Sequence, residues 1–506
     1  MKTHLTSFFL IIIVLGSLFV RLYRISETQT FLEDEGRDML IIRRMIETKL
    51  PVLLGPQTST GNMYLGPIYY YFITPALIIS GGNPVGPAIF IALTGVLTTF
   101  LLFYLGRLWF GSFAGLVASS LYAFLPYPVM FNRNSWNPNL VPLVMLLLLW
   151  TASKIRLSKD KILWKPVFIF GLLSGVIMQL HYMALVGVGA LGVYIIARNY
   201  RHFSQLLISL LIGFLGVVFT LTPFLVFEFR NQFVNSRALV GFLTGTTENN
   251  LQYNISPGKW WLRVSDTYQL VISGQLGGAA FHKEPYSQQL TIIYLGFLVI
   301  LFLTFRKQNS HITLLLTVFI VSLLVLGFYQ EYIHLHYLGF FLPVTYLLIG
   351  SVIRISNLRY FLGLITLLIL GYNFITLNSY LNSNPTNQKV KAQKVADYIV
   401  AAAKDRKYNV VMRQMGQTSP FQYYLSLAKN RPSNELETTL FLICDGSPCN
   451  QDDETTTLLY LTGPSHPSLK DYLGHPQLNE FRGERQMISN ELVNYGIWVA
   501  ELVVSK

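Results

Sequence analysis

Charged residues are scarce in this chain of 506 residues: Asp, Glu, Lys and Arg together make up 12%. That is about half of the roughly 25% usual for a soluble domain, and too little to cover the surface of soluble domains of this length. Only two cysteines are present, which excludes a disulfide scaffold. Neither a phosphate-binding Gly-rich loop nor a Ser nucleophile elbow is found. With 52% hydrophobic residues, the composition predicts a polytopic membrane protein.

Acidic residues are fewer than basic ones, and the formal net charge is +13. Residues 384–506 hold 13 basic and 13 acidic side chains, so the excess lies in residues 1–383, with 25 basic against 12 acidic. There the basic side chains lie in short segments between apolar runs, which is the pattern of a membrane topology. No Lys/Arg stripe with interleaved aromatic residues is present, so nucleic acid is not expected as a partner.

Apolar runs of membrane-spanning length, roughly 17–25 residues, recur throughout residues 1–383. The run at residues 1–20 has no small-residue cleavage site after it and is predicted to be a retained first helix. We expect 11 spanning helices in total. The other ten are expected at 86–106, 112–131, 139–153, two within 166–197 with a break at His181, 203–227, 289–305, 312–330, 335–353 and 360–378.

Residues 66–80 (GPIYYYFITPALIIS) form a shorter apolar run whose placement decides the topology. If this run does not span and the N-terminus is cytoplasmic, the inner segments hold 13 basic residues against one acid, Asp160. If it spans, all of these basic residues except Lys2 move outside, against the positive-inside rule. We therefore predict an interfacial helix here, a cytoplasmic N-terminus and an outward C-terminus.

This topology predicts two domains in a multi-pass protein of the cell membrane. Residues 1–383 form the transmembrane domain, with a first outer loop at 23–85 and another outer loop at 229–288. Residues 384–506 are predicted to form a small extracytoplasmic α/β domain. Its expected elements are a helix near 388–404 and strands at 408–413, 438–444, 457–461 and 492–503. Its two cysteines, Cys444 and Cys449, are compatible with a disulfide or with two buried thiols.

The densest charged cluster of the outer face is Asp34-Glu35-Gly36-Arg37-Asp38, directly after the first helix. It begins a segment with helical spacing of apolar residues, so Asp34 and Arg37 would share a face. A carboxylate beside a guanidinium can act as a base next to an anion-binding group. An ordinary solvated loop whose acid caps a helix is the alternative interpretation.

Other candidate residues lie at predicted outer turns and helix ends. Arg133 can pair with a phosphate and Trp136 can stack on a sugar, although both are equally typical of an interfacial anchor. His181 ends a helix, and it can be a ligand-binding residue or a hydrogen-bonded core residue. His334 and His336 lack a third ligand for a metal. A divalent metal is possible but not supported by the sequence, and no other cofactor is expected.

The order of the motifs EDEGRD, LGPIYYYFITPALII, GRLWFG and AFLPYPVMF after a first helix resembles a known family. It is similar to the GT-C membrane glycosyltransferases, particularly the group with protein O-mannosyltransferases and the lipid A aminoarabinose transferase. The likeness covers about residues 5–200, with weaker support from HYLGFFLP at 336–343. The resemblance implies a helix bundle with juxtamembrane helices in the first outer loop and polyprenyl-phosphate sugars as donors.

Through this resemblance, Asp34 matches the catalytic acid, Glu35 its usual neighbour, and Arg37 a basic residue that faces the lipid phosphate. Two departures stand out: Gly66 precedes Pro67 where the aminoarabinose transferase has a Lys, and Asn137 replaces an Asp before a Pro. The remaining residues expected to bind substrate are Arg133, Trp136, Asn137, His181, His336 and Tyr337.

The expected function is therefore transfer of a hexose or pentose from a polyprenyl-phosphate donor to an acceptor hydroxyl at the outer membrane face, with inversion. Asp34 would be the general base. The acceptor can be a lipid, a glycan or a protein, and membrane lipids surround the chain. The alternative is a transporter or flippase of lipid-linked saccharides. Such proteins usually place charges near the midplane and show repeated halves, and neither feature appears in this sequence.

Overall fold

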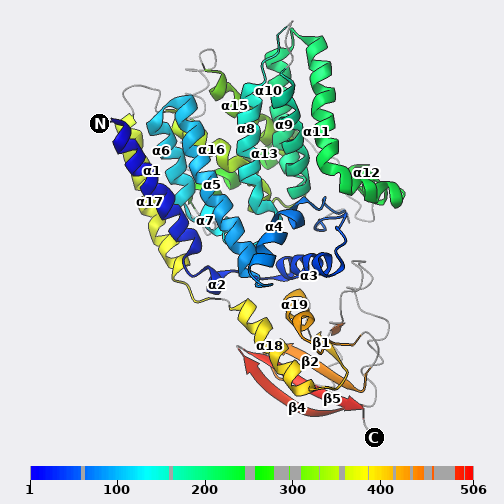
Figure 1. The fold of residues 1–506 in the computed structure, drawn as a ribbon. Coiled ribbons are helices and arrows are strands. Elements are labelled where there is room, and N and C mark those ends of the chain that lie inside the picture. Colours follow the sequence, from blue (N-terminus) through cyan, green and yellow to red (C-terminus); the bar gives the residue numbers. More distant parts are fainter. Residues whose placement is uncertain are drawn as a thin grey trace. The chain divides into compact units, whose positions relative to one another are not determined.

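The computed structural model describes residues 2–58, 63–158, 163–244, 257–277, 296, 309–329, 331–352, 359–385, 387–413, 418–433, 437–449, 458–460, 485–494 and 496–504. They are mostly helical, with one sheet near the C-terminus (Figure 1). Two compact units are present: unit 1 comprises Met1–Ile25, Leu53–Ile79 and Gly86–Ser383, and unit 2 comprises Ser26–Val52, Ser80–Val85 and Asn384–Lys506. Parts of the predicted first outer loop thus group with the C-terminal residues.

Unit 1 is built from apolar helices, as predicted. Its helices are α1 (Lys2–Leu22), α4 (Ile68–Ile79), α5 (Val85–Phe110), α6 (Ser112–Phe124), α7 (Pro126–Phe131), η1 (Asn137–Leu140), α8 (Val141–Lys154), α9 (Trp164–Leu180), α10 (Ala184–Asn199), α11 (Phe203–Arg230), α12 (Val234–Thr244), α13 (Pro257–Gly277), α15 (Ser310–Leu326), η3 (Leu335–Leu338), α16 (Phe341–Ser351) and α17 (Arg359–Leu381). α1 and α17 lie side by side (Figure 1), and Val20 packs there with Leu377 and Leu381.

Four helices among the described residues are long and apolar enough to cross a membrane: His4–Leu22, Val85–Phe110, Phe203–Arg230 and Gly363–Leu381. Six shorter apolar helices have 10–17 residues: Ile68–Ile79, Ser112–Phe124, Trp164–Leu180, Ala184–Asn199, Ser310–Leu326 and Phe341–Ser351. A helix of about 17 residues is about 26 Å long, close to the roughly 30 Å of a bilayer core. These helices support an integral membrane protein, while the count of 11 spans stays a prediction.

Several predicted helices differ from the observed ones. The run at 112–131 is two helices, because Pro126 favours extended backbone at Leu125 and α7 starts after it. The run at 335–353 is divided into η3 and α16. The described parts of the expected outer loop 229–288 contain α12 and α13. The break at His181 is confirmed, and the predicted helix at 289–305 lies outside the described residues apart from residue 296.

Unit 2 contains α3 (Glu33–Thr48) and most of α2 (Ile25–Thr28), together with a C-terminal α/β fold. The C-terminal elements are α18 (Gln388–Ala403), β1 (Tyr408–Arg413), α19 (Ser419–Leu427), β2 (Thr439–Asp445), β3 (Leu458–Tyr460), β4 (Arg485–Asn494) and β5 (Ile497–Val504). The strand order is β3-β1-β2-β5-β4, and only β1 and β2 are parallel among these pairs. The predicted C-terminal α/β fold is confirmed. Its extracytoplasmic location stays a prediction.

Both faces of the central strands are buried, which explains their nearly continuous hydrophobic sequences. Val410, Phe441 and Val499 pack with α18 and α19 on one face, whereas Leu442 and Ala500 pack with the Cys444–Cys449 disulfide on the other. The disulfide resolves the two alternatives for these cysteines. The predicted strand at 492–503 is wrong as a single element, because a turn with Gly496 at φ +81° divides β4 from β5.

Candidate active site

Helix α3 in unit 2 carries the acidic cluster singled out by the sequence. Glu33, Asp34 and Glu35 lie in its first turn, where negative charge is favoured by the helix dipole. The Glu35 carboxylate accepts hydrogen bonds from the Leu32 backbone N–H and the Thr30 hydroxyl, both at 2.7 Å, and is buried. Glu35 therefore caps the start of α3. Its predicted part in the reaction stays a prediction.

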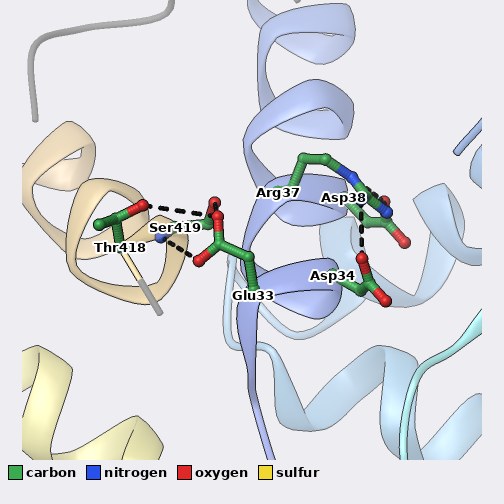
Figure 2. A network of polar contacts seen from close by, with 6 residues as sticks. All are labelled: Glu33, Asp34, Arg37, Asp38, Thr418 and Ser419. Carbon is green, nitrogen blue, oxygen red and sulfur yellow. Dashed lines mark hydrogen bonds and ion pairs between the residues drawn. The ribbon is translucent and has the colours of Figure 1, made fainter. Parts of the chain in front are cut away.

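Arg37 lies between two carboxylates on the same side of α3 (Figure 2). Its Nη1 donates to Asp34 Oδ1 at 2.7 Å, while Nη2 and Nε donate to Asp38 Oδ1 at 2.9 and 3.2 Å. The side chains differ in exposure: 45% for Asp34, 18% for Arg37 and 0% for Asp38. Asp34 is thus the carboxylate of this trio that a substrate can reach, and Asp38 holds Arg37 from the buried side.

The predicted pair of Asp34 and Arg37 is present in the structure, three residues apart on one helix. Asp38, four residues after Asp34, was missed as a site residue, although its spacing on a helix places it on the same face. Two negative charges beside one positive charge make this trio, which we call the α3 trio, net acidic. It can accept a proton at Asp34 and bind an anion at Arg37.

Arg133 in unit 1 is fully buried and lies at the end of α1. Its Nη1 donates to the carbonyl oxygens of Val20 (2.6 Å) and Arg21 (3.2 Å), and its Nη2 to that of Tyr23 (2.7 Å). A cation near the last carbonyls of a helix is favoured by the helix dipole. This placement favours an anchoring role for Arg133, and its predicted phosphate contact stays a prediction.

Arg21 is a second buried arginine of unit 1, which the sequence analysis did not single out. It donates to the carbonyl oxygens of Tyr122 (2.8 Å) and Ala123 (3.0 Å) and to the Ser17 hydroxyl (2.8 Å). These bonds join α1 to the end of α6. The available signal was a charged residue directly after the first apolar run, residues 1–20.

Four predicted substrate-binding residues come together in unit 1 as an aromatic cluster: Trp136, His181, His336 and Tyr337. The ring centroids are 4.3 Å apart for Trp136 and His336, 4.6 Å for His336 and Tyr337, and 4.8 Å for His181 and Tyr337. His334 stacks on His336 at 5.3 Å and extends the cluster. Flat rings at these distances offer faces on which the apolar side of a sugar can pack.

The imidazoles of His181 and His336 are uncharged at neutral pH. Burial lowers the pKa of His181 to about 4. Burial, with His181 and His334 nearby, lowers the pKa of His336 to about 3. Neutral imidazole can donate one hydrogen bond and accept another, so this cluster is suited to hydroxyl groups better than to a phosphate.

Asn137 and Gln179 each contact a segment of unit 1 that is distant in the sequence. Asn137 is buried and its Nδ2 donates to the carbonyl oxygen of Leu180 at 2.6 Å, directly before His181. The Gln179 side chain fills the space beside Gly66, because a Cβ at Gly66 would lie 2.3–2.5 Å from three of its atoms. A side chain at position 66 therefore has no room while Gln179 occupies this place.

No group of three or more His, Cys, Asp and Glu side chains that could hold a metal ion is found in the described part of the chain. The predicted site residues fall into the two units. Asp34, Glu35 and Arg37 belong to unit 2, whereas Arg133, Trp136, Asn137, His181, His336 and Tyr337 belong to unit 1.

Comparisons with known proteins add a family and a fold. Residues 65–227 match the dolichyl-phosphate-mannose-protein mannosyltransferase family. No curated protein matches the chain. ArnT from Cupriavidus metallidurans bound to undecaprenyl phosphate is 14% identical, with a TM-score of 0.60 over 99% of this chain and 98% of that chain. The Archaeoglobus fulgidus oligosaccharyltransferase tethered with an acceptor peptide is 14% identical, with a TM-score of 0.50 over 86% of this chain and 60% of that chain.

At these identities the structural likeness establishes the fold. The family match at residues 65–227 overlaps the stretch in which the sequence resemblance was recognised, but it begins after the EDEGRD motif. That resemblance is confirmed: this chain has the fold of the GT-C membrane glycosyltransferases.

Proposed function

We propose that this chain is a membrane glycosyltransferase that moves a sugar from a polyprenyl-phosphate donor to an acceptor hydroxyl at the outer membrane face. The observation that carries the proposal is the α3 trio, in which Arg37 lies between half-exposed Asp34 and buried Asp38. The trio offers a base and an anion-binding group on one helical face. The family match and the fold shared with ArnT, crystallised with undecaprenyl phosphate, support the donor class.

In the proposed reaction, the acceptor hydroxyl oxygen attacks the anomeric carbon of the donor sugar. The bond from this carbon to the phosphate oxygen breaks, and polyprenyl phosphate leaves with the bonding electron pair. Asp34 accepts the hydroxyl proton, a contribution of about 10²- to 10⁴-fold in rate for a general base. A single displacement of this kind inverts the anomeric configuration.

Arg37 would stabilise the phosphate of the donor and the leaving group. Its Nη1 is bonded to Asp34 in the described structure, so a phosphate oxygen at this atom would replace the Asp34 carboxylate. Asp38 keeps its contacts to Nε and Nη2, which hold the guanidinium in place during the exchange. Donor binding would thereby release Asp34 for the proton transfer.

The aromatic cluster of unit 1 would bind a sugar ring. Trp136 and Tyr337 supply ring faces, and the neutral imidazoles of His181 and His336 supply hydrogen bonds to hydroxyl groups. Asn137 would support the cluster through its bond to Leu180. The KM values of Trp136→Ala for donor and acceptor identify this sugar. A raised KM for the donor assigns the cluster to the donor sugar, and a raised KM for the acceptor assigns it to the acceptor.

The Cys444–Cys449 disulfide supports an extracytoplasmic location for the C-terminal residues, because disulfides persist in oxidising compartments. The charge distribution of 13 basic residues against one acid supports the same orientation. The acceptor would be reached from that side, and a lipid, a glycan or a protein each offers the hydroxyl that the reaction needs.

A transfer assay tests the proposal. Purified protein is incubated with radiolabelled polyprenyl-phosphate sugars and with lipid, glycan and protein fractions of the cell envelope. We expect the label to move to one fraction and polyprenyl phosphate to be released in equal amount. Asp34→Asn should lower the transfer rate about 10²- to 10⁴-fold, whereas Asp445→Asn, at an exposed acid of unit 2, should retain wild-type transfer. Movement of intact donor across a vesicle membrane without transfer would instead establish the transporter alternative.

A further inference from the structure

The Glu33 side chain of α3 reaches the first residues of α19, 385 or more residues later in the chain. One carboxylate oxygen accepts the backbone N–H of Ser419 at 2.9 Å, and the other accepts the hydroxyl groups of Ser419 and Thr418, the latter at 3.5 Å. Figure 2 shows these contacts on one side of α3 and the Asp34–Arg37 contacts on the other. Glu33 thus acts as a cap for the N-terminus of α19, where a carboxylate is favoured.

The backbones of α3 and α19 approach each other closely at Gly36. A Cβ at this position would lie 2.6 Å from the backbone nitrogen of Pro420 and 2.6 Å from the carbonyl carbon of Ser419. Since neither backbone atom can move away as a flexible side chain can, only glycine fits here. Gly36 lies between Asp34 and Asp38 in the sequence, so this close approach is made by the same turn of α3 that carries the α3 trio on its other side.

Contacts on both sides of Gly36 extend the packing along α3. Phe31 is buried and packs edge-on against Tyr423 and Tyr424, with both ring centroids at 6.0 Å. Near the other end of the helix, Arg43 donates to the Ser426 hydroxyl at 3.2 Å and Glu47 pairs with Arg431 at 3.2 Å. These contacts fix both the position of α3 and its rotation about its own axis.

A small rotation of α3 would matter for the proposed reaction. A carboxylate lies about 5–6 Å from the axis of its helix, so a rotation of about 20° moves it by about 2 Å. A misplacement of about 1 Å can cost about 10²-fold in rate. From these contacts we infer that α19 is the element that orients Asp34 and Arg37, and that Glu33 and Gly36 are its positioning residues. This inference rests on the proposed function of the α3 trio.

Two variants test the inference in the full-length protein. Gly36→Ala should lower kcat at least 10-fold because the added methyl group pushes α3 away from α19. Its matched control is Gly192→Ala in α10, where an added Cβ meets no atom within 4 Å; this control should retain wild-type kcat. Glu33→Ala removes the cap without adding an atom and should lower kcat 10- to 100-fold, while Glu33→Gln, which keeps one acceptor oxygen, should lower it less.

A second measurement separates positioning from a general loss of structure. If Glu33 acts through Asp34 and Arg37, Glu33→Ala should reduce the residual transfer of Asp34→Asn by a smaller factor than it reduces wild-type transfer. The thermal unfolding midpoint of the Glu33 variants is recorded in parallel. Wild-type kcat in both Glu33→Ala and Gly36→Ala would overturn the inference, as would additive losses in the double variant. Wild-type turnover in Asp34→Asn alone would instead overturn the proposed function.

Discussion

Arg37 and Asp38 are consecutive residues of α3, and one oxygen of the Asp38 carboxylate accepts hydrogen bonds from both Nε and Nη2 of Arg37, at 3.2 and 2.9 Å. The Asp38 side chain is fully buried, so this contact fixes one edge of the guanidinium on the inner side of the helix. The remaining nitrogen, Nη1, faces the more exposed Asp34. Asp38 therefore determines which edge of Arg37 a phosphate can use.

Asp38→Asn is predicted to weaken donor binding without removing any atom that touches the substrate. The amide keeps an acceptor oxygen but loses the negative charge, so Arg37 is held less firmly. A charge-assisted hydrogen bond contributes about 1.5–3 kcal/mol, and we expect a 10-fold or larger rise in the donor Kd. Titration of the donor, followed by fluorescence or calorimetry, measures this Kd. If Asp38→Asn has wild-type affinity and turnover, Asp38 does not orient Arg37.

Arg37→Ala should weaken donor binding or transfer by about 10- to 150-fold, which corresponds to the loss of one charge-assisted contact of about 1.5–3 kcal/mol. Arg37→Lys should recover only part of this loss, since a single ammonium group lacks the planar array of donors with which Arg37 contacts Asp38 through Nε and Nη2 and presents Nη1 to the phosphate. Arg133→Ala is the matched comparison. Because Arg133 donates to the last carbonyls of α1, it should mainly lower the unfolding midpoint. If Arg37→Ala keeps wild-type donor affinity and turnover, while Arg133→Ala folds but no longer binds the donor, the phosphate site is at Arg133.

Protonation of the aromatic cluster should destabilise the fold at low pH. The pKa values of His181 and His336 are lowered by burial to about 4 and about 3, below the usual 6.5. Between these values and 6.5 the unfolded chain binds more protons, so stability falls as the pH drops from about 6.5 towards 4. We expect the unfolding midpoint to fall less over this range in His181→Asn than in the wild type. Equal falls in both proteins would contradict a half-buried, neutral His181.

The proposed topology is tested by labelling of introduced cysteines in intact cells. Asp405→Cys and Ser158→Cys are both at exposed positions, and the two native cysteines are joined in a disulfide. A membrane-impermeant maleimide should modify Asp405→Cys, in the C-terminal residues, and leave Ser158→Cys unmodified until the cells are opened. The reverse result would place the C-terminal residues in the cytoplasm.

Patterns among neighbouring residues correctly predicted those structural features that depend mainly on neighbouring residues, such as helix starts, helix breaks and strands. The acidic cluster forms the first turn of a helix, and the break at His181 and the strand at 408–413 are where periodicity placed them. α19 was missed, although Ser419 followed by Pro420 is a typical helix start. β4 and β5 were not separated because the Gly496 turn was not recognised within an apolar run.

The partners of single side chains could not be predicted from the sequence, because they depend on contacts between distant segments. Glu33 resembled the acids of the cluster that follows it in the sequence, yet its carboxylate accepts the backbone N–H of Ser419. Arg133 was predicted as a phosphate ligand, and only the packing of α1 shows that its donors meet backbone carbonyls. Asn137 likewise reaches Leu180 through the folding of two helices. Residue composition and spacing do not specify which distant residues form these hydrogen bonds.

The claim that Asp34 is the general base is tested most directly by measuring donor binding and single-turnover transfer together for Asp34→Asn. The amide keeps the shape of the side chain but cannot accept a proton at neutral pH. We predict a rate about 10²- to 10⁴-fold below wild type, with donor affinity retained or increased, since the carboxylate that competes for Arg37 is gone. Wild-type single-turnover rates in Asp34→Asn would contradict the account.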